Sequence, residues 1–235
     1  MKIPINLPLA DIVPGPELFD HPSTIHGQAH VARVMVHAFR LIEATGWHDE
    51  AVRLWACVFC HDLARKNDDA DISHGEAAAR KLLTPISDPL SLANRLRNSG
   101  VLATDYAAIV RAVTMHCKRD DWTMDRLLTL LKDSDGLDRV RLGDLDPGRL
   151  RTPEARAMVP FAYDLFNETD GKDGDGFSVI PAGPGHFAAL VDVVNRLTGA
   201  AVYDHRNPDQ GGCALHALER DGSQDRTTPS NGEAL

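Results

Sequence analysis

The sequence over residues 57–68 is Cys57-Val-Phe-Cys-His-Asp-Leu-Ala-Arg-Lys-Asn-Asp68. Its apolar first half belongs to a pattern that predicts a buried helix over residues 49–64, and its charged second half predicts a loop. The pair His61 and Asp62 stands where that helix ends. An imidazole nitrogen beside a carboxylate, at the edge of a core, is typical of a binding site for a divalent metal ion. We therefore expect the rest of the chain to supply further ligands.

Two cysteines precede this pair, and with His61 they spell the C-x-x-C-H pattern of haem attachment. Haem attachment requires export, and the start Met-Lys-Ile-Pro-Ile-Asn-Leu-Pro has prolines where a signal peptide needs an apolar stretch. We expect Cys57 and Cys60 to be small buried side chains of an apolar helix, not haem or zinc ligands. Together with Cys117 and Cys213 they do not form the pattern of a disulfide framework.

The composition is that of an ordinary globular protein, since 43% of the 235 residues are hydrophobic and 25% are charged. We expect one main domain in the cytoplasm, because no segment approaches the roughly 20 continuous apolar residues of a membrane span. A formal net charge of -9 argues against binding a nucleic-acid polymer, which requires clustered Lys and Arg. A small anionic ligand in a locally basic pocket is compatible with this charge. The sequence makes no prediction about oligomeric state.

Apolar residues recur at helical spacing, and no stretch shows the sustained alternation of a strand, so the predicted fold is all-α. Ser23 or Thr24 can cap the first helix, and Gly46 can end it. Pro89 fits the first turn of the helix expected over residues 88–98. The expected helices cover residues 23–46, 49–64, 73–83, 88–98, 105–117, 124–132, 152–167 and 187–197.

The predicted organisation has three parts. Residues 1–22 contain five prolines and form an irregular arm laid over the surface. Residues 23–200 form the helical domain, interrupted over residues 168–185 by a loop rich in Gly, Asp and Pro. Residues 207–235 have the polar composition of a disordered tail.

Three histidines lie in the first predicted helix. His26 and His30 are four residues apart and so share one face, and His37 follows seven residues later on nearly the same stripe. A single histidine on a helix is usually a partly buried ring that is hydrogen-bonded to a carbonyl group. Three aligned histidines are unusual, and the motifs that follow in the chain favour a functional role for His30.

A fourth histidine, His74, is expected in the first turn of the helix over residues 73–83. Ser73 and Glu76 fit a capping box at its start. The helix dipole disfavours an imidazolium there, so the ring is expected to stay neutral and available to a metal. Free amides beside Gly75 also suit a phosphate group.

Six histidine and aspartate residues lie at or near the ends of separate predicted helices, and a helical bundle can point all of them into one cavity. Nitrogen and carboxylate donors without thiolate favour a divalent transition metal (Mn, Fe, Ni, Co or Zn) over calcium. One or two ions are expected. The six are His30, His61, Asp62, His74, His116 and Asp135.

The ordered set resembles the HD-domain superfamily over residues 23–142. The resemblance implies a helical bundle with a metal site in its core. It also implies that four residues hold one ion: His30, His61, Asp62 and Asp135. His74 and His116 look like the additional ligands of two-metal members, with Asp62 shared; in a one-metal site they would face the ligands or the substrate instead. The segments that carry the resemblance are Ile25-His-Gly-Gln-Ala-His30-Val-Ala-Arg-Val34, His61-Asp62-Leu-Ala-Arg65, His74-Gly-Glu-Ala-Ala78, Ala112-Val-Thr-Met-His116 and Lys132-Asp-Ser-Asp135-Gly-Leu-Asp-Arg139.

Two assignments stay open at this point. His26 can orient a substrate, act as an acid, or replace His30 as a ligand, although the Val-Ala-Arg-Val that follows His30 fits the family context better. Asp133 competes with Asp135 in the same way. Asp138 and Arg139 are expected to support the ligands.

The resemblance implies metal-dependent hydrolysis of a small phosphate ester, often a nucleotide. The expected catalytic residues are Asp62, His26, Arg65 and Lys118. Lys66 and Arg119 are further cations that follow ligand residues, and all four cations are equally well explained as solvated helix ends.

Two other functions fit the same ligand set. Some HD-domain proteins are mixed-valent di-iron oxygenases that cleave C–C or C–P bonds, and others are catalytically idle modules that sense a ligand. The Arg65-Lys-Asn-Asp loop before His74-Gly favours the hydrolase.

Overall fold

A computed structural model describes residues 1–83, 91–122, 124–169, 183 and 185–199. Within these ranges all regular secondary structure is helical, which confirms the all-α prediction. The α-helices are α1 (Gln28–Thr45), α2 (Ala51–Cys60), α3 (His74–Leu82), α4 (Leu92–Asn98), α5 (Tyr106–Met115), α6 (Arg126–Leu137), α7 (Pro153–Ala157), α8 (Val159–Thr169) and α9 (His186–Thr198). The 3-10 helices are η1 (Leu9–Asp11), η2 (Pro16–Leu18), η3 (His48–Glu50), η4 (Ala103–Asp105), η5 (Asp138–Leu142) and η6 (Pro147–Arg149).

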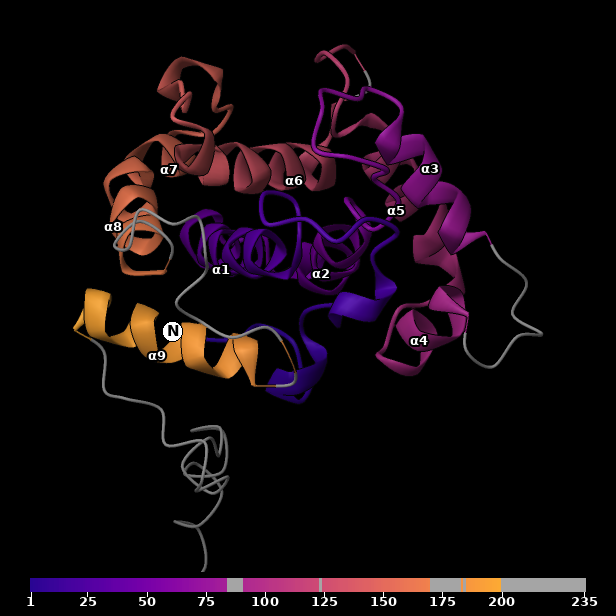
Figure 1. The fold of residues 1–235 in the computed structure, drawn as a ribbon, viewed down its shortest axis with the longest axis horizontal. Helices are drawn as coiled ribbons and strands as arrows, with labels where there is room; N and C mark the ends of the chain where they lie inside the picture. The colour runs from indigo at the N-terminus through magenta and orange to yellow at the C-terminus, as the bar shows by residue number, and fades with distance from the viewer. Residues whose placement is uncertain (84–90, 123, 170–182, 184, 200–235) are drawn as a thin grey trace, which may run out of the picture. The chain divides into compact units, whose positions relative to one another are not determined.

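Helix α1 is the central element of the unit Met1–Val202. It packs against α2, α6 and α9, and Figure 1 shows it between α6 and α9. Its buried residues lie on all sides of the helix, as expected of a helix that others enclose. His30 lies in the first turn of α1, so this arrangement puts a histidine within reach of several neighbouring helix ends.

Helix α1 begins at Gln28, later than the predicted start at residue 23. Ser23 Oγ accepts hydrogen bonds from the N–H groups of Ile25 (3.0 Å) and His26 (2.7 Å), so it closes a turn ahead of the helix. A Cβ at Gly27 would collide with the carbonyl of Ser23, which leaves room only for glycine. His26 therefore precedes the helix, and the prediction that it shares a helical face with His30 is wrong. Gly46, with a φ of 71°, ends α1 as predicted.

Helix α6 continues past its predicted end at Lys132 and finishes at Leu137. The polar residues after Lys132 have weak helix propensity, but Ser134 Oγ donates to the carbonyl of Leu130 (2.7 Å) and Leu137 is fully buried. Tertiary packing thus overrides local propensity here. The consequence for the site is that Asp135 lies inside a helix, one turn after Lys132.

The helix predicted over residues 152–167 is divided into α7 and α8. Pro160 causes the break, because it has no N–H to donate to the carbonyl of Arg156. Thr152 caps α7 by accepting a hydrogen bond from the N–H of Ala155 (3.1 Å).

The predicted capping box of α3 is also wrong. Ser73 Oγ donates to the carboxylate of Asp71 (2.6 Å), and Glu76 pairs with Arg80 (2.6 Å). Charged partners form stronger hydrogen bonds than a backbone N–H does, so both side chains turn away from the helix start.

The N-terminal arm is irregular apart from η1 and η2, as predicted, but part of it is inserted into the core. Ile12 has no exposed surface, and its carbonyl accepts a hydrogen bond from Trp55 Nε1 of α2 (2.8 Å). Helix η1 also packs against α9. The prediction that the arm lies over the surface is therefore wrong for this segment.

Some predictions fall on residues outside the described ranges: Pro89, most of the loop 168–185, and the tail 207–235. Helix α4 begins at Leu92, where Ser91 Oγ accepts from the N–H of Asn94 (3.3 Å). Cys57 and Cys60 are fully buried, which confirms their prediction as core side chains. Among the described helices, none is long and apolar enough to cross a membrane.

Candidate metal centre

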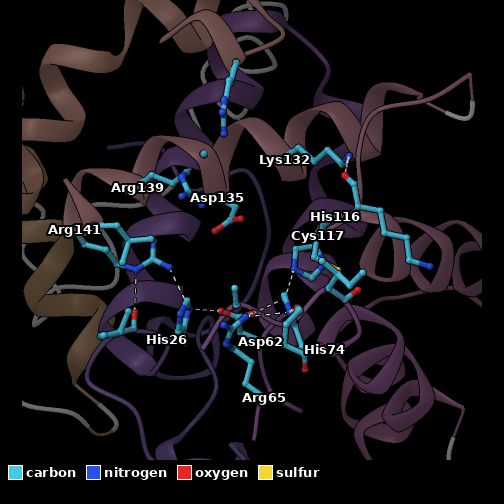
Figure 2. Close-up of a pocket in the computed structure, with 18 of the residues that line it drawn as sticks. His26, Asp62, Arg65, His74, His116, Cys117, Lys132, Asp135, Arg139 and Arg141 are labelled. Atoms are coloured by element: carbon cyan, nitrogen blue, oxygen red, sulfur yellow. Dashed lines mark hydrogen bonds and ion pairs between the residues drawn. The ribbon is translucent and has the colours of Figure 1, made fainter. Parts of the chain in front are cut away.

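The predicted ligands come from five helix ends or turns and form one cluster, of which Asp62, His74, His116 and Asp135 line a cavity. His30 comes from α1, His61 and Asp62 directly follow α2, and His74 is the first residue of α3. His116 follows α5 and Asp135 lies in α6. The cavity has a volume of about 500 Å³. Figure 2 shows Asp62 and Asp135 on opposite sides of it, with His74 and His116 between Asp62 and Lys132.

Four of the imidazoles share one orientation. The Nδ1 atom of His61 donates to the carbonyl of Val58 (2.8 Å), and that of His116 donates to the carbonyl of Val113 (2.6 Å). The Nδ1 atoms of His30 and His74 face the Asp138 carboxylate (2.7 Å) and the Asp71 carbonyl. A proton held at Nδ1 leaves Nε2 with a free lone pair, which is the tautomer that binds metals.

The Nε2 atoms converge on the two carboxylates. His30 Nε2 lies 3.2 Å from His61 Nε2, 3.4 Å from Asp62 Oδ2 and 3.5 Å from Asp135 Oδ1. His74 Nε2 lies 2.9 Å from His116 Nε2 and 3.2 Å from Asp62 Oδ1. Two donors at about 2.1 Å from one ion are about 3.0 Å apart at a right angle and about 3.4 Å apart at the tetrahedral angle. The observed spacings fit donors that share an ion.

Asp62 presents its two carboxylate oxygens to two different groups. Oδ2 faces His26 (3.2 Å), His30 (3.4 Å) and His61 (3.8 Å), whereas Oδ1 faces His74 (3.2 Å). One donor group consists of His30, His61 and Asp135. Asp62 therefore lies between this group and the pair on the α3 side, in the position of a shared ligand.

The pKa values of the two carboxyl groups favour their ionised form. Burial opposes the charge of Asp62, but His61 and hydrogen bonds from the surrounding imidazoles hold the pKa of Asp62 well below its usual value. Burial opposes the charge of Asp135 as well, and His30 and His61 lower its pKa. Both carboxylates are thus negatively charged at neutral pH, the form that binds a metal.

The histidines differ in the direction in which their pKa values are shifted. Burial is the main cause that lowers the pKa of His61, and it lowers the pKa of His116 to about 4, so both rings are neutral at pH 7. Burial would also lower the pKa of His74, but its hydrogen bond to Asp62 and the charge of that carboxylate raise it. The helix dipole was expected to favour the neutral ring, and the shift in the pKa of His74 has the opposite direction. A metal ion at this position would take the place of the proton.

His26 occupies a different position from the other four rings. It uses Nδ1, not Nε2, to face Asp62, and the same atom lies 3.2 Å from the guanidinium of Arg141. Its ring centre is 5.8 Å from that of His30. His26, His30 and Asp62 form a further group with metal-binding spacing, so the structure brings His26 to the rim of the centre.

Asp138 supports His30 from a fully buried position. Its Oδ1 accepts from Arg33 Nε at 2.6 Å, and its Oδ2 faces His30 Nδ1. Arg141, three residues later in η5, also reaches Oδ2 (3.4 Å). The expectation that Asp138 supports the ligands matches this geometry, whereas Arg139 lines the cavity and pairs with Asp144.

Asp133 faces away from the centre. Its carboxylate accepts hydrogen bonds from the N–H (2.8 Å) and Oγ1 (2.8 Å) of Thr152 and from the N–H of Arg151 (2.8 Å). These bonds tie α6 to the start of α7. The geometry favours Asp135 over Asp133 as the ligand.

The α3 side of the centre depends on a close approach between α3 and α5. A Cβ at Gly75 would lie 2.5 Å from the carbonyl of Val113 and 3.0 Å from His116 Nδ1. Glycine at this position therefore lets His74 and His116 meet. Cys117 completes a third donor group with these two histidines. Sequence reasoning missed Cys117, although it directly follows His116.

The cations around the cavity differ in part from the expected set. Arg65 is buried and lies 3.7 Å from Asp62 Oδ1, and Lys118 is exposed at the cavity wall. Lys66 and Arg119, also in the described part of the chain, are exposed and are not among the residues that line the cavity. Arg139, which was expected to support the ligands, also lines the cavity. Sequence reasoning missed four other lining cations, of which only Arg141 carried a signal, its spacing of three from Asp138. They are Lys132, Arg141, Arg149 and Arg151.

His37 does not join the centre. Its ring is fully buried against Phe161, with ring centres 6.1 Å apart. In the described structure neither of its nitrogens has a hydrogen-bond partner. Its place on nearly the same helical stripe as His30 therefore does not make His37 a further candidate ligand.

Comparisons of the chain with models of protein families, with curated proteins and with solved structures find no match. Function therefore has to be inferred from the donor atoms and charges of this chain. Its most informative feature is the convergence of four imidazole Nε2 atoms on two carboxylates.

Proposed function

We propose that the protein is an HD-type, metal-dependent phosphohydrolase that acts on a small phosphate ester, such as a nucleotide. The observation that carries this proposal is the set of inward-facing Nε2 atoms, each fixed by a partner at Nδ1, around Asp62. Nitrogen and oxygen donors at this spacing suit a divalent transition metal. The order of the ligands along the helical chain agrees with the HD-domain pattern.

Two ions fit the donors. His30, His61, Asp62 and Asp135 would hold one, and His74 and His116 would hold the other together with Asp62. A bound divalent ion supplies a nucleophile at neutral pH, because it lowers the pKa of a coordinated water, and it stabilises charge on a phosphoryl oxygen.

The cavity walls contribute positive charge to the same reaction. The side chain of Arg141 is 7% exposed, lines the cavity, and shares Asp138 with Arg33 and His30, so one carboxylate is paired with three basic groups. The resulting excess positive charge suits phosphoryl oxygens, whose negative charge grows during hydrolysis. Arg65 supplies a second cation on the α3 side, and Lys118 extends the positive wall toward solvent.

His26 is positioned to orient the substrate. It lies between Asp62 and Arg141, within 3.2 Å of each, and it lines the cavity. A side chain that contacts both a ligand and a cation can fix the relative position of the metal centre and the phosphate group.

The test combines metal analysis with a substrate screen. Protein purified without added metal is expected to contain transition metal by elemental analysis and to release phosphate from a nucleotide panel with manganese or nickel. Asp62→Asn should lose both metal and turnover, because it removes the shared ligand. Asp69→Asn is the matched control, since Asp69 is an exposed carboxylate at the cavity wall. Metal retention in Asp62→Asn, or no turnover in wild type with any metal, would refute the proposal.

A di-iron oxygenase is the second candidate, because a carboxylate between two groups of nitrogen donors also suits a pair of iron ions. Iron content with an intervalence electron-paramagnetic signal and dioxygen uptake would favour it. The surplus of cations at the cavity wall favours the hydrolase.

A further inference from the structure

A second group of charges lies on the α6 side of the cavity, apart from the proposed metal ligands. The Asp120 carboxylate receives two hydrogen bonds from Arg151, Nε to Oδ2 (2.9 Å) and NH2 to Oδ1 (2.8 Å), and a third from Lys132 Nζ to Oδ1 (2.7 Å). A guanidinium and an ammonium group that face one anion suit a phosphate group as well as they suit a carboxylate.

Lys132 is unusually placed for a lysine. Its side chain is 2% exposed, and Nζ also donates to the carbonyl of Lys118 (2.7 Å). A charge that is buried to this extent requires an anionic partner. Arg151 is held in place by Asp133, which is itself fixed by Thr152. The two cations thus have defined positions.

Asp120 is the member of this group that can be replaced. Its side chain is 45% exposed, and it lies between α5 and α6, outside any helix, two residues before Trp122, which is 94% exposed. Asp133, by contrast, has no exposed surface and accepts a hydrogen bond from Thr152, the residue that caps α7. An incoming anion can therefore displace Asp120 and leave Asp133 in place.

The position of the group relative to the metal centre follows from α6. Lys132 and Asp135 are three residues apart on this helix, so they are neighbours on its surface, and both line the cavity. Figure 2 shows Lys132 on the same side of the cavity as His116. An anion bound at Lys132 would lie beside a group bound at the metal centre.

We propose that Lys132 and Arg151 form a second anion site beside the metal centre, that Asp120 fills it in the free protein, and that a substrate with two phosphate groups replaces Asp120 with the phosphate that does not react. The role in substrate binding rests on the proposed hydrolase function. The anion site itself does not.

Phosphate binding to the full-length protein tests the site. Calorimetric titration with inorganic phosphate should show that Asp120→Asn binds about tenfold more tightly than wild type, because Lys132 and Arg151 lose their internal competitor. Asp69→Asn removes the same charge from the cavity wall without contacting either cation, and it should change binding less than about twofold. Adding Lys132→Met to Asp120→Asn should abolish the gain.

The possible results test the anion site and the hydrolase function independently. If Asp120→Asn binds phosphate no more tightly than Asp69→Asn, the site is refuted and Asp120 is only a structural ion-pair partner. Asp120→Ser provides an independent second variant if the asparagine destabilises the fold. With substrates, Asp120→Asn should lower the KM of a nucleoside diphosphate more than that of p-nitrophenyl phosphate. A gain in phosphate binding without hydrolysis of either substrate would support the site and contradict the hydrolase.

Discussion

Asp133 and Asp135 show how much two residue positions in a helix can change a side chain's surroundings. Residues two apart point to nearly opposite faces of a helix. Asp133 faces Thr152 and Arg151, whereas Asp135 faces His30 Nε2. The sequence could not distinguish these two carboxylates as candidate ligands, whereas the structure places only Asp135 beside His30 and gives Asp133 a structural role.

Substitution of these two residues should separate metal binding from stability. Asp135→Ala is expected to fold and to lose metal, because it removes a ligand of the first group. Asp133→Ala should keep metal but lower the free energy of unfolding by about 2 kcal/mol, since it removes the acceptor at the start of α7. Elemental analysis and urea unfolding of both variants measure the two effects. Full metal retention in Asp135→Ala would show that Asp133 is the ligand instead.

His37 should make stability depend on pH. Burial lowers its pKa to about 4 in the folded protein, against about 6.5 in the unfolded chain. Between these values the unfolded chain binds more protons, so the free energy of unfolding decreases as pH falls from about 6.5 to about 4. The full effect of His37 is roughly 3 kcal/mol.

Replacing His37 by leucine should remove this part of the pH dependence. Urea unfolding at pH 7 and at pH 4.5 should show a smaller loss of stability in His37→Leu than in wild type. His48→Asn changes an exposed histidine and should leave the wild-type dependence intact. Equal pH dependence in His37→Leu and wild type would contradict a buried neutral ring.

At the scale of elements, the contact between α3 and α5 brings together the donors proposed for a second ion. Among the described elements these two helices form the most extensive pair, and a Cβ at Gly75 would meet both the Val113 carbonyl and His116 Nδ1. Neither helix carries both histidines, so the pair His74 and His116 exists only through this packing.

Gly75→Ala should selectively weaken the α3 side of the metal centre. Its Cβ would be 2.5 Å from the Val113 carbonyl, which backbone atoms cannot accommodate without moving α3 away from α5. We expect the metal content to fall from two ions to about one per chain and the free energy of unfolding to fall by about 1–3 kcal/mol. Glu76→Ala, an exposed change on the same helix, should retain both ions. Two ions in Gly75→Ala would show that the α3–α5 distance does not control this site.

For the whole molecule, a short segment of the N-terminal arm is part of the core. Ile12 is fully buried and its carbonyl accepts a hydrogen bond from Trp55, so folding of the domain involves this segment. Ile12→Ala should therefore lower the free energy of unfolding by about 2–4 kcal/mol, as for other large-to-small core changes. Asp11→Ala next to it is exposed and should change stability by less than about 0.5 kcal/mol. Equal stability of the two variants in urea would show that the arm lies on the surface.

The sequence alone determined the helical class, the order of the candidate metal ligands along the chain and most helix positions. These properties follow from the local spacing of apolar residues and from the chemistry of single side chains. The α9 region and the end of α1 at Gly46 are examples, since both depend on residues close in the chain.

Only the tertiary structure decided which imidazole nitrogen faces the cavity, which of two aspartates joins the centre, and which cations surround it. Each of these depends on contacts between separate elements: His30 meets Asp138, His26 meets Arg141, and Lys132 in α6 meets Asp120 in the segment before that helix. Periodicity reports which face of a helix is buried but not what lies against it. The orientation of the ligands is a property of packing, because it requires contacts that form only when the separate helices meet.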